Sequence, residues 1–271
     1  MKKKREIFFL LIFLIIFFYS LNIYGEDLYP PGIKKIKSRG KIVIAMYYKD
    51  IFPFFFHNKK GQLVGYDVKI SETIAKQLNV QVEFNRNPKT FDEIIEYVSS
   101  GKADIGVSLI SVTLNRAKKV FFTDPYLILH PVLVLNRLKS TNYTFIYGDK
   151  IPGVIGIKKG TSYIEFAKKI FLNPKLKFYN SWSDVVKDLI SGKIFAMLRD
   201  EVGVANMISS DPSLSIRIKR IVIKNFYDYI AIAVNPRYKH LNYWINLLLK
   251  TYKFERNVNK IIKKYKSGIE K

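Results

Sequence analysis

Hydrophobic positions along the chain follow two spacings, one typical of strands and one typical of helices. Residues 40–48, GKIVIAMYY, form an apolar run that begins after a glycine, and QVEFN at 81–85 is a second short extended run. Between them, residues 68–80 repeat apolar side chains at every fourth position, which predicts one buried helix face. The residues on that face are Ile70, Ile74 and Leu78. This alternation predicts an α/β fold with largely parallel sheets.

A duplicated unit indicates two lobes of the same design. FDEIIEYVSSGKADIGVSL at 91–109 and WSDVVKDLISGKIFAMLRD at 182–200 align without gaps. Each copy opens with an aromatic residue and acidic residues, continues through an apolar pair and Ser-Gly-Lys, and ends in an apolar strand. Gly101 and Gly192 are expected to close the two helices in a left-handed conformation. Two such units in one chain predict two α/β lobes.

Two extended segments, 127–136 and 227–236, predict strands that leave the first lobe and return to it. Two antiparallel connecting strands form a natural hinge. We therefore expect lobe 1 to comprise residues 26–128 and 229–271, and lobe 2 to comprise residues 129–228. The C-terminal tail has the pattern of an amphipathic helix. Its expected core positions are Leu247, Leu248, Ile261 and Ile262.

The N-terminus predicts export. MKKKRE supplies a positive segment, and residues 7–18, IFFLLIFLIIFF, form an uninterrupted apolar stretch before polar residues return. Residues 1–25 are therefore expected to be a cleaved signal peptide. The alternative is an uncleaved membrane anchor, because residues 7–24 approach spanning length. In both cases the folded part is expected in a periplasmic or other extracytoplasmic location.

The chain is strongly basic, with 46 Lys and Arg against 22 Asp and Glu and a net charge of +24. Such a charge raises the question of nucleic-acid binding. The lysines are scattered, however, and no zinc pattern or helix-turn-helix signal accompanies them, so no nucleic-acid partner is expected. The absence of cysteine excludes disulfides and thiolate metal sites. No metal and no cofactor are expected.

Residues 111–126, SVTLNRAKKVFFTDPY, place Ser111, Thr113 and Arg116 directly after a buried strand. The stretch is either a solvated loop or a socket for a carboxylate. It resembles a motif of the periplasmic solute-binding proteins of the polar amino-acid type, family 3. Further likenesses cover the chain from about residue 40 to 268. They are FPFFF followed by a hairpin, GYDVKISETIAKQL, GIKKGTSY and GKIFAMLRD.

The resemblance implies a type II clamshell of two lobes, joined by two hinge strands, that closes on a free amino acid. Arg116 suits the α-carboxylate, because a guanidinium offers two parallel donors in the carboxylate plane. Ser111 would be its neighbour, and Thr161 and Ser162 open a helix whose free N–H groups favour the same anion. Asp200, after a buried strand, suits the ammonium group. Leu109 lies at the matching strand exit of lobe 1.

Several of these residues also have ordinary structural interpretations. Asp200 could cap the helix EVGVANMI, or Glu201 could be the ligand group instead, while Ser111 and Thr161 could be helix caps. Three aromatic residues are candidates for lining the side-chain pocket, although most aromatics in such runs belong to a core: Phe91, Tyr47 and Phe54.

The sequence does not determine the chemical type of the ligand's side chain. Tyr47 and Tyr48 stand where several relatives carry a polar or acidic residue, and aromatics there suit stacking or cation–π contacts. Lys158 and Arg199 add basic groups near the mouth of the site. Polar, acidic and aromatic amino acids all remain candidates.

The leading hypothesis is a non-catalytic, monomeric receptor that delivers an amino acid to the membrane subunits of an ABC importer. A second hypothesis is an exported enzyme of the same fold, similar to cyclohexadienyl or arogenate dehydratases. The three histidines, His57, His130 and His240, fall in a predicted turn, the hinge region and the tail, which disfavours catalysis. A third is a ligand-sensing domain tethered to the membrane by its N-terminal segment.

Overall fold

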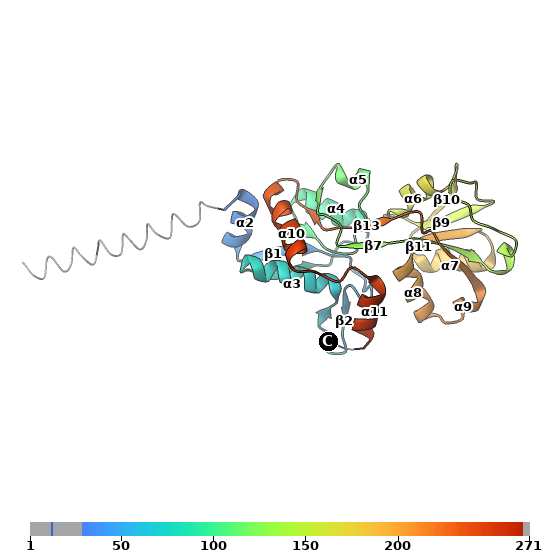
Figure 1. Ribbon diagram of the computed structural model, residues 1–271, viewed down its shortest axis with the longest axis horizontal. Coiled ribbons are helices and arrows are strands. Elements are labelled where there is room, and N and C mark those ends of the chain that lie inside the picture. The colour runs from blue at the N-terminus through green and yellow to red at the C-terminus, as the bar shows by residue number, and fades with distance from the viewer. Residues whose placement is uncertain (1–11, 13–28, 268–271) are drawn as a thin grey trace, which may run out of the picture.

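The computed structural model describes residue 12 and residues 29–267, and shows two α/β lobes joined by a pair of strands (Figure 1). The predicted signal peptide, residues 1–25, lies almost wholly outside the described residues. In the part of the chain that is described, no helix is both long and apolar enough to cross a membrane. The two-lobed α/β clamshell predicted from the sequence is confirmed.

The first lobe is built on a five-stranded sheet of order β4-β1-β5-β14-β6, in which β4, β1 and β5 are mutually parallel and β14 is antiparallel to both neighbours. Its strands are β1 (Lys41–Ala45), β4 (Gln81–Asn85), β5 (Ile105–Gly106), β6 (Phe121–Phe122) and β14 (Ala233–Val234). A separate hairpin pairs β2 (Phe56–His57) with β3 (Leu63–Val64). The helices are α2 (Pro31–Arg39), α3 (Tyr66–Leu78), α4 (Phe91–Ser100), α5 (Leu114–Ala117), α10 (Lys239–Thr251) and α11 (Val258–Lys266).

The second lobe repeats this design with a sheet of order β10-β9-β11-β8-β12, again with three mutually parallel strands followed by antiparallel ones. Its strands are β8 (Pro131–Asn136), β9 (Val154–Lys158), β10 (Lys175–Tyr179), β11 (Ala196–Asp200) and β12 (Ile218–Val222). The helices are α6 (Tyr163–Ile170), α7 (Trp182–Ser191), α8 (Glu201–Ser210) and α9 (Leu214–Arg217), with a 3-10 turn η1 at Leu138–Ser140.

The hinge is a two-stranded antiparallel ladder between β7 (Leu127–Leu129) and β13 (Asp228–Ile230), which lies between the two lobes (Figure 1). The predicted connecting segments are thus confirmed as paired strands. Each extended segment continues past the hinge into a sheet, since β8 joins the second lobe and β14 joins the first.

The duplicated unit folds in the same way in both lobes. Helix α4 begins at a Thr90 cap whose hydroxyl accepts a hydrogen bond from the backbone N–H of Glu93, and it ends at Gly101 with φ of 83°. Helix α7 begins at a Ser181 cap and ends at Gly192 with φ of 75°. Hydroxyl caps and left-handed glycines therefore set the same helix length in each lobe.

The C-terminal helices bury only part of their expected core. Leu248 and Ile261 are buried in the core of the first lobe, and Ile262 packs against it. The prediction for Leu247 is wrong, because 64% of its surface is exposed. Leu247 and Leu248 are adjacent on α10, so the helix turns one of the two away from the core.

A buried carboxylate ties α3 to the hinge. Asp67, in the first turn of α3, accepts hydrogen bonds from the backbone N–H of Leu109 at 2.8 Å and from the Tyr126 hydroxyl at 2.9 Å. Burial raises the pKa of Asp67 to about 7, although both hydrogen bonds act to lower it. Because Tyr126 directly precedes β7, this contact positions the strand exit after β5 and the start of the hinge together.

We predict that Asp67→Asn changes how stability depends on pH. In the unfolded chain the carboxyl ionises near pH 4, while in the folded protein it stays protonated up to about pH 7, so wild-type stability falls through this window. The variant lacks this titration. Its free energy of unfolding, minus that of the wild type, should rise by up to about 1.4 kcal/mol per pH unit between pH 4 and 7 and then level off.

Urea unfolding at a series of pH values measures this difference, with Asp149→Asn in an exposed segment as the matched control. A constant difference between Asp67→Asn and wild type across pH 4–7 would contradict the prediction.

Candidate functional site

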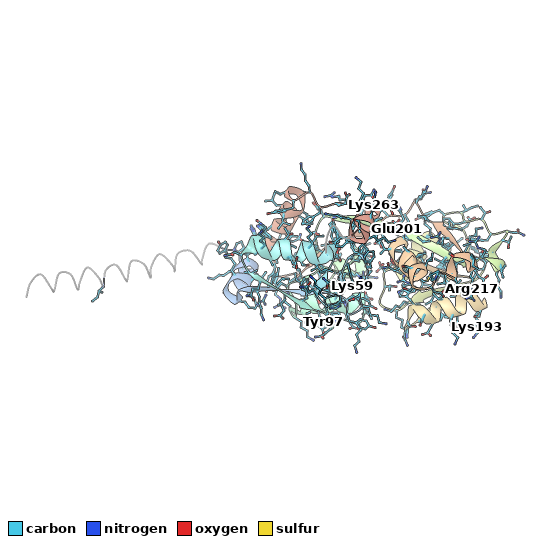
Figure 2. All side chains as sticks on the ribbon, turned by 90° about the horizontal axis from the view of Figure 1, so that it is seen from below. Lys59, Tyr97, Lys193, Glu201, Arg217 and Lys263 are labelled. Carbon is cyan, nitrogen blue, oxygen red and sulfur yellow. The ribbon has the colours of Figure 1, made fainter. Side chains whose placement is uncertain are left out.

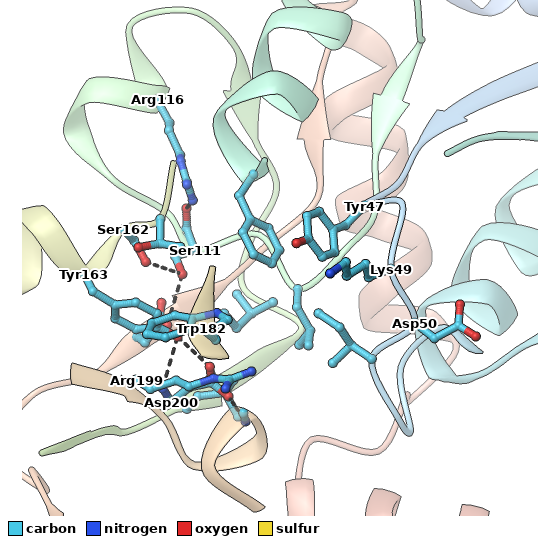
Figure 3. Close-up of a pocket in the computed structure, with 18 residues that line it drawn as sticks. Tyr47, Lys49, Asp50, Ser111, Arg116, Ser162, Tyr163, Trp182, Arg199 and Asp200 are labelled. Carbon is cyan, nitrogen blue, oxygen red and sulfur yellow. Dashed lines mark hydrogen bonds between the residues drawn. The ribbon is translucent and has the colours of Figure 1, made fainter. Parts of the chain in front are cut away.

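A cavity between the two lobes brings together eight residues named in the sequence analysis as candidates for a ligand site (Figure 3). Residues from both lobes and from the hinge line it. The predicted residues in its wall are Tyr47, Phe91, Leu109, Ser111, Arg116, Thr161, Ser162 and Asp200. The carboxyl ends of β1, β9 and β11 point toward this cavity, which is the usual place for a ligand in open α/β sheets.

Arg116 is held at one end of the cavity by a partner outside it. Its side chain is buried, and its Nε and Nη2 atoms donate to Oδ1 of Asp92 at 3.0 and 2.8 Å. Nη1 donates to the backbone oxygen of Ser111 at 3.0 Å. Thr113 caps α5, the short helix that carries Arg116. The loop after β5 therefore presents a fixed guanidinium rather than a solvated one.

A chain of hydroxyls crosses from the second lobe to the hinge. The Ser162 hydroxyl donates to Ser111 Oγ at 3.0 Å, and the Ser111 hydroxyl donates to Oδ2 of Asp228 at 3.0 Å. Asp228 lies in β13 and is buried, and burial raises the pKa of its carboxyl to about 7. Its Oδ1 atom has no hydrogen-bond partner among the described residues. Asp228 thus lines the cavity with a buried carboxyl group, one oxygen of which is unsatisfied.

Asp200 ends β11 and also caps α8. Its Oδ1 accepts a hydrogen bond from the Gly203 backbone N–H at 2.7 Å, and its Oδ2 accepts one from the Tyr163 hydroxyl. The capping interpretation is therefore correct, and the carboxylate still lines the cavity. The alternative residue, Glu201, lies outside the cavity wall and accepts a hydrogen bond from the His130 backbone N–H.

Thr161 and Leu109 contribute through their backbone positions. The Thr161 hydroxyl donates to the backbone oxygen of Lys158 at 2.7 Å and fixes the loop that precedes α6. Neither Thr161 nor Ser111 is a helix cap, so that alternative is wrong for both. Leu109 adopts a left-handed φ of 48°, with its N–H bound by Asp67.

Aromatic and basic side chains occupy the opposite end of the cavity. Tyr47 stacks on Phe91 with ring centroids 5.0 Å apart, and the Lys158 ammonium donates to the Tyr47 hydroxyl at 3.0 Å. The Arg199 guanidinium lies 4.6 Å from the centre of the Trp182 ring. Burial raises the pKa of Tyr47 to about 12. Phe54, expected to line the pocket, is instead fully buried in the first-lobe core, because its ring packs against the ring of Tyr66.

The lobes touch on both sides of the cavity. Asn115 of the first lobe donates to Glu165 of the second at 3.1 Å, and Asn206 of the second donates to the backbone oxygen of Phe52 at 2.8 Å. Gly160 lies so close to the first lobe that a Cβ atom there would come 2.6 Å from Cβ of Thr90. The structure is therefore in a closed state.

The sequence analysis missed several residues of the site. Asp228 was placed only in a hinge strand, although a lone carboxyl in the apolar run YDYIAIAV was a usable signal. Asp92 and Trp182 stand in the sequence as parts of the duplicated unit, and Lys49 lies in no recognisable motif. The three histidines lie outside the cavity wall, and the described residues hold no cluster of three or more acidic or histidine side chains that could bind a metal.

Surface charge is spread over both lobes. Figure 2 shows Lys59 and Lys263 on the first lobe and Lys193 and Arg217 on the second, all of them exposed. This distribution agrees with the scattered lysines seen in the sequence.

Comparisons with known proteins agree with this geometry. The family model for bacterial extracellular solute-binding proteins, family 3, matches residues 43–268. The arginine-binding periplasmic protein of Mannheimia haemolytica is 27% identical over 80% of this chain and 87% of its own length.

Two solved structures show the same fold. One is AbpA, an amino acid ABC transporter substrate-binding protein from Streptococcus pneumoniae bound to L-arginine. It has a TM-score of 0.68 and 26% identity, over 88% of this chain and all of that one. The other is AncCDT-1, an ancestral amino acid-binding protein and precursor of cyclohexadienyl dehydratase. It has a TM-score of 0.65 and 26% identity, over 86% of this chain and 97% of that one.

Proposed function

The chain belongs to family 3 of the bacterial extracellular solute-binding proteins, and we propose that it captures a free amino acid between its lobes and delivers it to an ABC importer. The observation that carries this proposal is the placement of Arg116 and Asp200 on different lobes in the wall of one cavity. A zwitterion removed from water needs a partner for each charge, because an unpaired buried charge is costly.

The α-carboxylate would bind at the Arg116 end. The guanidinium is already oriented by Asp92 and by the Ser111 backbone oxygen, so little side-chain freedom is lost on binding. Across the cavity, Thr161 and Ser162 precede α6, whose free N–H groups and positive end favour an anion. The carboxylate would therefore contact both lobes.

The α-ammonium would bind between two carboxyl groups. Asp200 comes from the second lobe and Asp228 from the hinge; both line the cavity, and the Oδ1 atom of Asp228 has no hydrogen-bond partner among the described residues. An ammonium there would supply the missing donor and would lower the pKa of Asp228, which burial raises in its absence. Both groups favour a charged amine over a neutral ligand.

Delivery would follow from closure. A ligand shifts the equilibrium toward the closed state only by the difference between its affinities for the closed and open states, so groups on both lobes are required.

We propose that the protein acts as an extracytoplasmic monomer, exported by residues 1–25 as a signal peptide. Retention of that segment would instead give a membrane-tethered receptor, and N-terminal sequencing of the exported protein distinguishes the two forms.

We predict that the exported protein binds at least one free amino acid in isothermal titration calorimetry. Arg116→Lys should then weaken binding by at least about thirtyfold, because an ammonium cannot replace the two parallel N–H donors of the guanidinium. Arg220→Lys, at an exposed position of β12, is the matched control and should bind as wild type. Failure of all common amino acids to bind refutes the proposed function, whereas full affinity in Arg116→Lys refutes only the role of that residue.

We further predict that Gly160→Ala weakens binding by roughly tenfold or more. Its added Cβ atom would overlap Thr90 of the opposite lobe and oppose closure. Gly148→Ala is a close control, because Gly148 also has a positive φ but faces open space, so it shares the backbone strain alone. Equal affinities for the two variants would show that the contact between Gly160 and Thr90 is not part of the ligand-bound state.

A second candidate function, dehydration of a cyclohexadienyl acid, is favoured by one observation. Asp228 offers the cavity a carboxyl with a pKa of about 7, which suits a general acid near neutral pH. We nevertheless expect no aromatic product when the protein is incubated with arogenate or prephenate, because we assign this carboxyl to the ligand ammonium. Product absorbance measures the reaction, and formation that Asp228→Asn abolishes would establish the enzyme instead.

A further inference from the structure

Three cations gather at the end of the cavity opposite Arg116, and we call them the cation cluster: Lys49, Lys158 and Arg199. Lys158 ends β9, Arg199 lies near the end of β11, and Lys49 follows β1. Arg199, Lys49 and Tyr47 line the cavity (Figure 3). Lys158 is not part of the wall but is buried against the hydroxyl of Tyr47.

The cation cluster interacts with Asp200 and Glu93 only through charge at a distance, without a salt bridge to any acid that the structure describes. Within residues 29–267, none of its members forms an ion pair, and the Arg199 guanidinium and the Lys49 ammonium donate no hydrogen bond. Lys158 has a single one, to the Tyr47 hydroxyl. A guanidinium carries five donors, so Arg199 presents unused donors to the cavity.

Arg199 is nevertheless held in a defined place. The Trp182 ring lies 4.6 Å from its guanidinium, and Gly203 lies against its stem, since a Cβ atom at Gly203 would come 2.2 Å from Nε of Arg199. A side chain confined between an aromatic ring and a helix backbone is a built feature rather than a mobile surface group.

The acidic side chains near the cation cluster already accept hydrogen bonds from other groups. Asp50 also lines the cavity, but its carboxylate accepts hydrogen bonds from Arg86 at 2.9 Å and from the His57 backbone N–H at 2.9 Å. Glu93 accepts one from the Lys89 backbone N–H at 2.8 Å. Asp200 interacts with Arg199 through its charge, but its carboxylate accepts hydrogen bonds from the Gly203 backbone N–H and the Tyr163 hydroxyl and, in the proposed function, meets the ligand ammonium.

Burial and mutual repulsion both disfavour the charged forms of the cation cluster, and a bound anion would offset both effects. Burial, followed by repulsion from Lys49 and Arg199, lowers the pKa of Lys158. Burial likewise lowers the pKa of Arg199. A negative charge between these groups would replace lost hydration and offset their repulsion.

We propose that the cavity selects an amino acid whose side chain is anionic, and that Arg199 and Lys158, with Lys49 at the mouth, bind that second negative charge. This inference rests on the proposed function, because it assumes that Arg116 and Asp200 take the backbone charges. A cationic side chain, such as the arginine bound by AbpA, would face three positive groups here. A stacking aromatic ligand would find one face of Tyr47 already covered by Phe91.

Calorimetry with two isosteric pairs tests the proposal: glutamate against glutamine and aspartate against asparagine, with arginine as a fifth ligand. We expect at least one acid to bind about a hundredfold or more tightly than its amide, and arginine to bind no better than the amides. Tighter binding of an amide or of arginine overturns this inference and leaves the proposed function standing. If none of the five ligands and no other common amino acid binds, both fall.

Two variants assign the effect to the cluster. Arg199→Gln and Lys158→Met should each reduce the ratio of acid to amide affinity by about tenfold or more while the amide affinity stays near that of the wild type. The matched control is Arg217→Gln, an exposed arginine on α9. An acid preference that both variants retain in full overturns the assignment, and circular dichroism and thermal unfolding show that each variant is folded.

Discussion

The antiparallel hinge between β7 and β13 is the constraint on which the rest of the site depends. Its register pairs Asp228 with Leu129 and Ile230 with Leu127. The loop after β5 is bound to the same strand, because the N–H of Val112 donates to Tyr229 and the N–H of Ala231 donates to Ile110. Ser111 is therefore fixed beside Asp228, and one short ladder sets where the two lobes meet.

Buried ionisable side chains determine which groups at the contact between the lobes can bind a ligand. Desolvation raises the pKa of the carboxyl groups of Asp67 and Asp228 and lowers that of the Lys158 ammonium, so each would gain from a partner of opposite charge. Asp67 has two hydrogen bonds within the first lobe and serves the fold. Asp228 accepts one hydrogen bond, and in the cation cluster only Lys158 donates one; both lie at the cavity. The number of hydrogen bonds within the protein therefore distinguishes buried polar groups that serve the fold from those available to a ligand.

Much of the fold was predictable from local sequence signals. The duplicated unit and its closing glycines depend on interactions within about twenty residues, such as the Thr90 and Ser181 caps. The two hinge segments were recognisable from their apolar, extended pattern, although they pair with each other across about a hundred positions. Arg116 and Asp200 were predictable from the motifs that contain them, SVTLNRAKKVFFTDPY and GKIFAMLRD; Arg116 lies on α5 after the loop that leaves β5, and Asp200 ends β11. The exposure of Leu247 and the burial of Phe54 were not, because adjacent apolar residues on a helix or in a loop do not reveal which of them meets the core.

The sequence by itself determined the two-lobed architecture, through the duplicated unit, and its resemblance to family 3 indicated the two residues proposed for the backbone charges of the ligand. Only the tertiary structure decided which distant side chains share the cavity. Asp92 reaches Arg116 across 24 positions, and Lys158 reaches Tyr47 across 111. Contacts of that separation are set by sheet order and by the hinge, and no local pattern encodes them. The charge at the side-chain end of the site is therefore a property of the folded protein.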